Sequence, residues 1–395
     1  MEKMVEVERA TQDELREDLR ALFQGAIRIT LEMVLEEEVK AMVGARRFER
    51  IGSRTDHRNG TFLRRFLTSM GQIEVAVPRS REQGSPVDVL GRYQRRAEEI
   101  DEMIAEAYVG GVSQRKMADV TEALMGERVG RSTVSRVAKR LDQAVDELRK
   151  QPIEGAHPYL YLDATFLDAR WARKVENVSA LMAYAVGPDG HRRLLGITLG
   201  SEESEDSWAE LLGQLVDRGL TGVQLVIADG HAGLAAAVRR FLPEARQQRC
   251  TVHLVRNVTA KVPRRLRKRV AREVGAIFKA ADLTKAKQRL AEVKARWTQE
   301  LPEAMTVLER GFVAATQFYA FPKAHWPRLR TTNGLERLHA EVKRRIRAVG
   351  AFPDRASALR LITAVALRVT ETWASRRYLD VSLLEEKNEA AVKAA

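Results

Sequence analysis

The chain has 395 residues, with 67 lysines and arginines against 54 aspartates and glutamates, so its formal net charge is +13. This length suggests two or three domains, and 31% charged with 45% hydrophobic residues describes a globular chain rather than a disordered or fibrous one. The sequence lacks an apolar run of membrane-spanning length, a signal-peptide core and a second cysteine, so we expect a soluble cytoplasmic protein. The excess of positive charge indicates either a polyanionic partner or a surface charge that only keeps the protein soluble.

The first region, residues 1–92, is predicted to be helical with a β-hairpin. Apolar residues recur near helical spacing up to about residue 48. A basic loop rich in helix-breaking residues follows, and then two strand-like runs at 61–67 and 73–77, the second ending at Pro78. We assign this region to DNA binding or oligomerisation.

Residues 93–150 contain two short helices of a kind found in helix-turn-helix domains. Ser113 is the expected N-cap of the first helix, which should end near Leu124. The second helix carries hydroxyl and cationic side chains at its start, which suit the phosphates and base edges of a DNA major groove. The expected DNA contacts are Arg131, Ser132, Thr133 and Arg136. An ordinary helix pair in an α-helical domain is the alternative.

After a linker at 151–158 the pattern changes from helices to strands. The expected strands are residues 159–163, 179–186, 193–199, 223–229 and about 247–252, with helices before and after the fourth. The predicted order is three strands, then a helix, a strand, a helix and a final strand, which is the order of a ribonuclease-H-like α/β sheet. We therefore interpret residues 151–253 as the first part of a catalytic domain. Residues 254–330 look entirely helical and residues 331–395 supply C-terminal helices.

Two carboxylates follow apolar strands: Asp163 and Asp229. Side chains at such strand ends project into the crevice where open α/β sheets build their sites, although a turn-forming or capping aspartate is the simpler alternative. Glu336, near the start of a helix over 335–349, is a third candidate, with a first-turn acid as its alternative role and Glu341 as a weaker choice. Oxygen donors without a Cys/His cluster select Mg²⁺ or Mn²⁺, and two such ions suit in-line displacement at phosphorus.

Several motifs together resemble the Mutator-type family of bacterial insertion-sequence transposases. They are YLDAT, DGHAGL, QRCTVHLVRN and TTNGLERLHAEVKRR, preceded by HRNG, GVSQRKMADV and RSTVSRVAKR, so the likeness covers nearly the whole chain. The resemblance implies a DDE site of Asp163, Asp229 and Glu336 on a ribonuclease-H-like fold, interrupted between Asp229 and Glu336 by an all-helical insertion. Cys250 and His253 match the family's Cys-x-x-His element.

Other side chains around these motifs are given supporting or DNA-binding roles. Cys250 and His253 are expected to support the site rather than bind zinc, because the chain has no other cysteine. His231 could touch the scissile phosphate or be structural. Between residues 254 and 281 many cations face a single acid, Glu273, which predicts a track along the phosphate backbone that weakens with salt. The cations assigned to DNA are Arg264, Arg265, Lys268, Lys343 and Arg344.

The predicted function is that of a transposase acting on the ends of its own element. Water would cleave one phosphodiester, and the freed 3′-hydroxyl would attack a second. The expected partners are double-stranded DNA, as terminal inverted repeats and as target, and a second copy in a dimer or larger synaptic assembly joined through the N-terminal helix. The expected location is the bacterial cytoplasm at the nucleoid. A structure-selective nuclease without strand transfer and a helix-turn-helix repressor are the alternatives.

Overall fold

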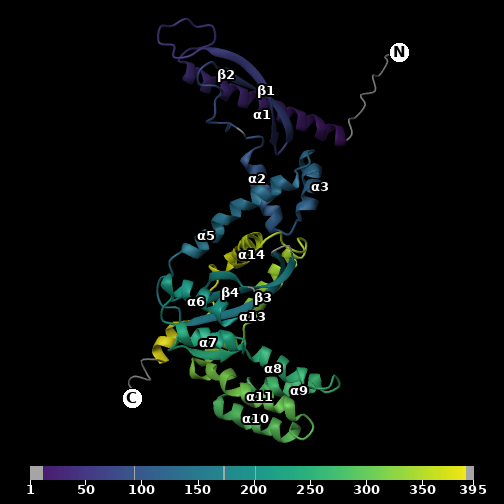
Figure 1. Ribbon diagram of the computed structural model, residues 1–395, viewed down its shortest axis with the longest axis vertical. Coiled ribbons are helices and arrows are strands. Elements are labelled where there is room, and N and C mark those ends of the chain that lie inside the picture. Colours follow the sequence, from purple (N-terminus) through teal and green to yellow (C-terminus); the bar gives the residue numbers. More distant parts are fainter. Residues whose placement is uncertain (1–11, 93, 172–173, 201, 388–395) are drawn as a thin grey trace, which may run out of the picture. The chain divides into compact units, whose positions relative to one another are not determined.

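The computed structural model describes residues 12–92, 94–171, 174–200 and 202–387 (Figure 1). The chain forms two compact units, Met1–Ala138 and Lys139–Ala395, which are described separately below. Within the described ranges, none of the helices combines the length and apolar composition needed to cross a membrane. Residues 1–11 of the predicted N-terminal helix lie outside the described part of the chain.

The first unit begins with a long helix packed on a hairpin. Helix α1 (Gln12–Val43) lies against strands β1 (Arg58–Thr68) and β2 (Gly71–Ser80), and the core between them contains Leu35, Phe66 and Val75. The predicted hairpin is confirmed, but Pro78 does not end the second strand. It pairs with Thr61 inside β2, where a two-stranded ribbon tolerates a residue without an N–H group.

Three helices complete the first unit: α2 (Glu98–Val109), α3 (Gln114–Met125) and α4 (Arg131–Ala138). The predicted N-cap is confirmed, because Ser113 Oγ accepts a hydrogen bond from the backbone N of Lys116 at 3.3 Å. Gly126, at φ +73°, ends α3 in the left-handed conformation that favours glycine. Buried Met117, Val134 and Val137 hold the helices together.

The second unit opens with the 3₁₀ turn η1 (Lys139–Leu141) and α5 (Asp142–Lys150), and is built on a five-stranded sheet of order β5-β4-β3-β6-β7. The strands are β3 (Tyr159–Trp171), β4 (Lys174–Val186), β5 (Arg192–Gly200), β6 (Leu225–Ala228) and β7 (Arg246–Arg249). The first three form the predicted antiparallel meander, and β6 and β7 run parallel to β3. The fold is therefore mixed α/β, as predicted.

Helices cover both faces of this sheet. Helices α6 (Glu205–Asp217) and α7 (Ala232–Phe241) enclose a core in which Trp208 meets Leu160 and Val226. Because side chains alternate along a strand, Tyr161 and Asp163 point to the other face. That face is covered by α13 (Asn333–Ile346), α14 (Arg355–Thr370) and the 3₁₀ turn η4 (Glu371–Trp373).

The segment between β7 and α13 is a helical module, as predicted for residues 254–330 (green in Figure 1). Its elements are α8 (Thr251–Ala260), α9 (Arg267–Ile277), α10 (Leu283–Trp297), α11 (Pro302–Ala315), η2 (Gln317–Ala320), η3 (Lys323–His325) and α12 (Trp326–Leu329). The module starts and ends at one place, because Thr251 N donates to the Arg330 carbonyl at 2.9 Å.

Candidate active site

The two aspartates lie level with each other on neighbouring strands. Parallel pairing of β3 with β6 runs to Tyr161 opposite Ile227, so the same register sets Asp163 opposite Asp229, just beyond the end of β6 at Ala228. The prediction that β3 ends at Asp163 is wrong, since β4 pairs with it as far as Trp171. Asp163 nevertheless faces an open edge, because β6 stops before reaching it.

Helix α13 brings Glu336 to the same edge of the sheet. The backbone N and Oγ1 of Thr332, its N-cap residue, both lie 3.5 Å from Cys250 Sγ. One turn after Glu336, the Nδ1 atom of His339 lies 3.4 Å from Asp163 Oδ2, and both side chains are nearly buried. The helix thus joins the end of β7 to the middle of β3.

Two cationic side chains of α8 contact Glu336. Arg256 Nη1 donates to Glu336 Oε1 at 2.8 Å, and His253 Nε2 lies 3.3 Å from the same oxygen. The Glu336 side chain keeps 26% of its surface exposed, so the carboxylate remains within reach of solvent and of a ligand. These contacts come from residues far apart in the sequence that meet at the ends of β7 and α12.

Cys250 is fully buried between the starts of α8 and α13. Its backbone N donates to the Ala228 carbonyl at 2.7 Å, which ties it to the end of β6. The neighbouring Cys250 thiol raises the pKa of His253 to about 9. Burial opposes ionisation of the thiol, but its interactions with His253 and Thr332 outweigh burial and lower the pKa of Cys250. Cys250 therefore lies beside the end of β6 and the start of α13, and His253 lies beside Glu336.

Three neighbours of the carboxylates escaped the sequence analysis: His339, Arg256 and Glu203. Burial raises the pKa of the Glu203 carboxyl, and the charges of Asp163 and Asp229 raise it further, which puts a fourth acid beside the pair. His231, the exposed N-cap residue of α7, opposes that shift. His339 follows Glu336 by three residues and so shares its face of the helix, which could have identified it from the sequence. Nothing in the local sequence indicates that Glu203 or Arg256 lies near the carboxylates.

The three carboxylates lie on β3, just beyond the end of β6 and on α13, and carboxylate oxygens are the donors that a hard divalent cation prefers. In the described part of the chain, no three His, Cys, Asp or Glu side chains are drawn close enough to form a ready-made metal cluster. Each carboxylate instead has another partner: Arg256 and His253 for Glu336, His339 for Asp163, and the Gly230 backbone N, at 2.6 Å, for Asp229. Metal binding would therefore exchange these contacts.

The residues predicted to read DNA lie at the start of α4 in the first unit. Arg131, Ser132 and Arg136 are exposed, Thr133 is half-buried, and Arg136 Nη2 lies 3.3 Å from Thr133 Oγ1. The buried Thr121 hydroxyl fixes the turn before α4, accepting from Val129 N at 3.0 Å and donating to the Ala118 carbonyl at 3.1 Å. The start of α4 is therefore held at a defined position against α3.

Replacing Thr121 with valine is expected to destabilise the chain by about 1–3 kcal/mol, because the Val129 N–H would be left buried without an acceptor. Urea unfolding followed by circular dichroism measures the change. The matched variant Thr133→Val, at a half-buried position of α4, should stay within about 0.5 kcal/mol of the parent. An equal loss in both variants would show that the Thr121 hydroxyl has no special role.

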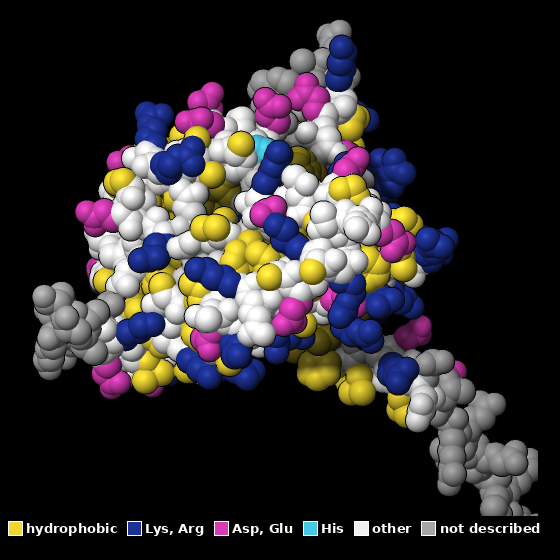
Figure 2. Space-filling view, turned by 90° about the horizontal axis from the view of Figure 1, so that it is seen from below, with side chains coloured by type: hydrophobic (Ala, Val, Ile, Leu, Met, Phe, Trp, Pro, Cys, Tyr) yellow, Lys and Arg dark blue, Asp and Glu magenta, His cyan; other side chains and the backbone are white. Residues whose placement is uncertain are grey.

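The cations of the helical module are less lopsided than the sequence suggests. Lys261 pairs with Glu303, Arg265 with Glu300, and Arg269 with Glu273. Figure 2 shows Lys and Arg side chains interspersed with Asp and Glu over the face that it draws. Of the other cations assigned to DNA, Arg264, Lys268 and Lys343 are exposed, while Arg344 contacts Glu341 at 3.1 Å. Two of these acids lie later in the module, Glu300 between α10 and α11 and Glu303 at the start of α11, whereas Glu273 lies on α9 itself.

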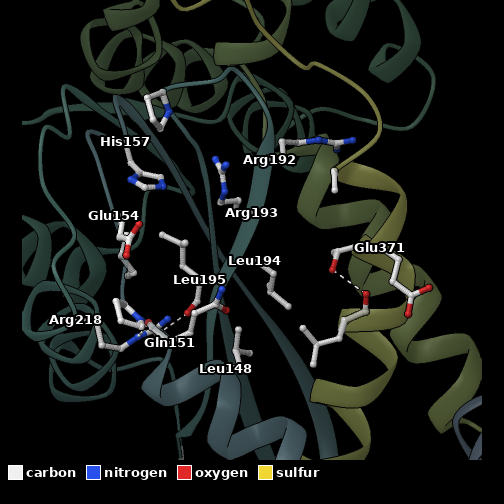
Figure 3. Close-up of a pocket in the computed structure, with 16 residues that line it drawn as sticks. Leu148, Gln151, Glu154, His157, Arg192, Arg193, Leu194, Leu195, Arg218 and Glu371 are labelled. Carbon is white, nitrogen blue, oxygen red and sulfur yellow. Dashed lines mark hydrogen bonds between the residues drawn. The ribbon is translucent and has the colours of Figure 1, made fainter.

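A cavity of about 690 Å³ lies at the other end of the sheet, near the start of β5 (Figure 3). Two of its basic side chains, Arg193 and Arg218, are already engaged. Arg193 binds Asp189 with contacts of 2.6 and 2.8 Å, and Arg218 donates to the carbonyls of Gln151 and Leu195 at 2.9 and 2.7 Å. This cavity is separate from the carboxylate edge, and Arg193 and Arg218 serve to hold the surrounding loops.

The chain is similar to known proteins over most of its length. The family described as "Transposase, Mutator family" matches residues 1–376. The transposase for insertion sequence element ISRM5 of Rhizobium meliloti is 35% identical over 370 residues, which is 93% of each chain. The transposase for IS406 of Burkholderia multivorans is 37% identical over 88% of this chain and 90% of its own. The transposase for IS1081 of Mycobacterium tuberculosis is 35% identical over 96% of this chain and 92% of its own. The chain therefore belongs to the Mutator family of transposases.

Proposed function

We propose that this transposase cuts and joins DNA at a site formed by Asp163, Asp229 and Glu336, with two Mg²⁺ or Mn²⁺ ions as cofactors. The observation that carries the proposal is the β3–β6 register, which aligns Asp163 with Asp229, together with the α13 contact between His339 and Asp163. The strand order, an antiparallel meander followed by two parallel strands, supports a ribonuclease-H-like catalytic core. The helical module between β7 and α13 supports the all-helical insertion.

The reaction needs no covalent link to the protein. Divalent ions, when bound, would activate the attacking oxygen and stabilise the departing one. In the first step water attacks phosphorus, the bond to the 3′ oxygen breaks, and a 3′-hydroxyl and a 5′-phosphate result. In the second step that hydroxyl attacks a target phosphodiester and expels its 3′ oxygen, so one bond forms for each bond broken. His339 and His253 orient the carboxylates that they contact.

Recognition of the element's ends falls to the first unit in this proposal. The start of α4 would enter the major groove of the terminal inverted repeats as the second helix of a helix-turn-helix. A face of α1 supports self-association, since its apolar side chains follow the spacing of a coiled-coil seam and each is half or more exposed in the described part of the chain. They are Leu15, Leu19, Leu22, Ile29 and Met33. A dimer would bring two ends of the element together.

The deciding experiment incubates the protein with labelled element-end DNA, unlabelled target DNA and Mg²⁺, and resolves the products on a denaturing gel. Cleaved ends together with a joined product support the proposal. Cleavage without any joined product would favour a structure-selective nuclease. Specific DNA binding without either product, unchanged in Asp163→Asn, would favour a helix-turn-helix repressor and overturn the catalytic assignment.

A further inference from the structure

A groove of about 350 Å³ lies beside Glu336, between α8, the end of α9 and the start of α13. Two of its lining residues connect it to the candidate active site. Arg256 lines the groove and pairs with Glu336, and Asn333 lies one turn before Glu336 on α13. A ligand in the groove would therefore lie next to whatever binds at the carboxylates.

One wall of the groove is apolar. Val252 and Val255 are three residues apart on α8 and so share one face of the helix, and Phe278 follows the end of α9. Both valines are half-buried, which leaves apolar surface open to a ligand. A wall of this kind fits a flat or compact apolar group, such as a nucleobase or a deoxyribose.

The other lining residues make the groove cationic. Arg256, Lys279 and Arg330 all line it, and none of the described residues that do so is acidic. Arg330 is held in place by a 3.4 Å contact from Nη1 to the Phe278 carbonyl, and the Lys279 side chain is exposed. Three other cations of the module, Lys261, Arg265 and Arg269, pair with acids that lie outside the groove. The groove selects a ligand that is both anionic and partly apolar.

We propose that this groove binds one nucleotide of the DNA strand adjacent to the phosphate attacked at the carboxylates. The base or sugar would rest on Val252 and Val255, and flanking phosphates would meet Lys279 and Arg330. A cationic groove with apolar surface for the bases is the general form of single-strand binding sites, and the volume, near the lower end of small-ligand pockets, suits one nucleotide. The inference rests on the proposed function, which supplies the DNA.

Arg256 links the two sites in this proposal. Its guanidinium now neutralises Glu336, and it lies on a flexible side chain that is 60% exposed. An incoming phosphate in the groove offers it a second anionic partner. Nucleotide binding would therefore draw Arg256 toward the strand and release Glu336 at the moment when the substrate is in position.

The test measures affinity without metal, so that no cleavage contributes. Element-end DNA is labelled with a fluorophore, a single abasic site is placed in turn at each nucleotide around the cleaved bond, and binding is followed by anisotropy in EDTA. For the parent protein we expect one position at which the abasic site lowers affinity by about fivefold or more. In Val255→Asp that position should lose its effect, because the wall that contacts the base is changed.

Matched variants separate the groove from a general change in charge. Val313→Asp makes the same change at a residue of α11 that is 68% exposed, and it should keep the parent's abasic profile. Lys279→Gln should weaken binding about threefold or more, while Lys287→Gln, an exposed lysine of α10, should not. The lysine pair also keeps the test decisive if Val255→Asp proves unstable.

The proposal for the groove is wrong if the parent shows no position at which an abasic site lowers affinity. It is also wrong if Val255→Asp keeps the parent's abasic profile and the two lysine variants weaken binding equally. Neither result affects the proposed reaction, which is judged by whether Asp163→Asn abolishes cleaved and joined products in Mg²⁺. If excess free deoxynucleotide raises the melting temperature of the parent but not of Val255→Asp, while the abasic profile is flat, the groove binds free nucleotide and the proposal for DNA fails.

Discussion

Replacing Glu336 with glutamine is expected to slow strand cleavage about a thousandfold or more and to leave the fold intact. The substitution keeps the shape of the side chain but removes the negative charge that would hold a divalent ion at α13, and a thousandfold corresponds to about 4 kcal/mol in the barrier. The ion pair with Arg256 is partly exposed, so its loss should cost less than about 1 kcal/mol of stability. Initial rates of cleavage with Mg²⁺ and thermal melting measure the two effects.

Glu341→Gln is the matched control on the same helix. Glu341 pairs with Arg344 and Arg345 on the surface of α13, and it is not one of the three carboxylates proposed to form the site. We expect its cleavage rate to stay within about twofold of the parent. If Glu336→Gln cleaves as fast as Glu341→Gln, the assignment of Glu336 as the third carboxylate is wrong.

Gly334→Ala is expected to lower cleavage at least about tenfold and stability by about 1–3 kcal/mol. A Cβ atom at Gly334 would lie 2.5 Å from the hydroxyl oxygen of Tyr184. Tyr184 has no room to move, because it is fully buried and its ring stacks on Tyr161 with centroids 4.4 Å apart. The start of α13 must shift instead, and Glu336, two residues later, would shift with it. Thermal melting and initial cleavage rates measure the two losses.

A second substitution tests this explanation. Removing the hydroxyl in Tyr184→Phe takes away the closest atom, so the double variant Gly334→Ala/Tyr184→Phe should recover much of the lost activity. As a control, Gly25→Ala in α1 adds the same methyl group where no atom lies within 4 Å, and it should be neutral or slightly stabilising. Failure of the double variant to recover would show that the loss does not arise from contact with Tyr184.

Much of the fold could be predicted because local signals decided it. Ser113 marks a helix start, Gly126 a helix end, and the turn at Gly71 joins two strand-like runs. The extent of β3 beyond Asp163 could not be predicted in the same way. In the structure Thr165 and Leu167 are buried while Phe166 and Asp168 are exposed. Because a polar residue holds one of the buried positions and an apolar residue one of the exposed positions, the strand leaves no apolar/polar alternation in the sequence.

The candidate site was predicted less completely than the fold. The three candidate carboxylates can be recognised from the sequence, because Asp163 and Asp229 follow apolar strand-like runs and Glu336 lies near the start of a predicted helix. Arg256 and Glu203 do not stand at such positions, because their proximity to the carboxylates depends on contacts with segments that are distant in the sequence. Arg256 reaches Glu336 only when the module returns to the end of β7, and Glu203 approaches the aspartates through the loop before α6. Tertiary contacts of this kind leave no periodic trace in the sequence.

The hydrogen bond from Thr251 to Arg330 has a consequence for how such chains diverge. Because the entry and exit of the helical module are joined, the length of chain between them does not set the distance from Cys250 to Thr332. Residues can be gained or lost in the loops between α9, α10 and α11 without displacing Glu336. Natural variation in this protein should therefore concentrate in those loops, while the two junctions keep a fixed spacing across otherwise unequal chains.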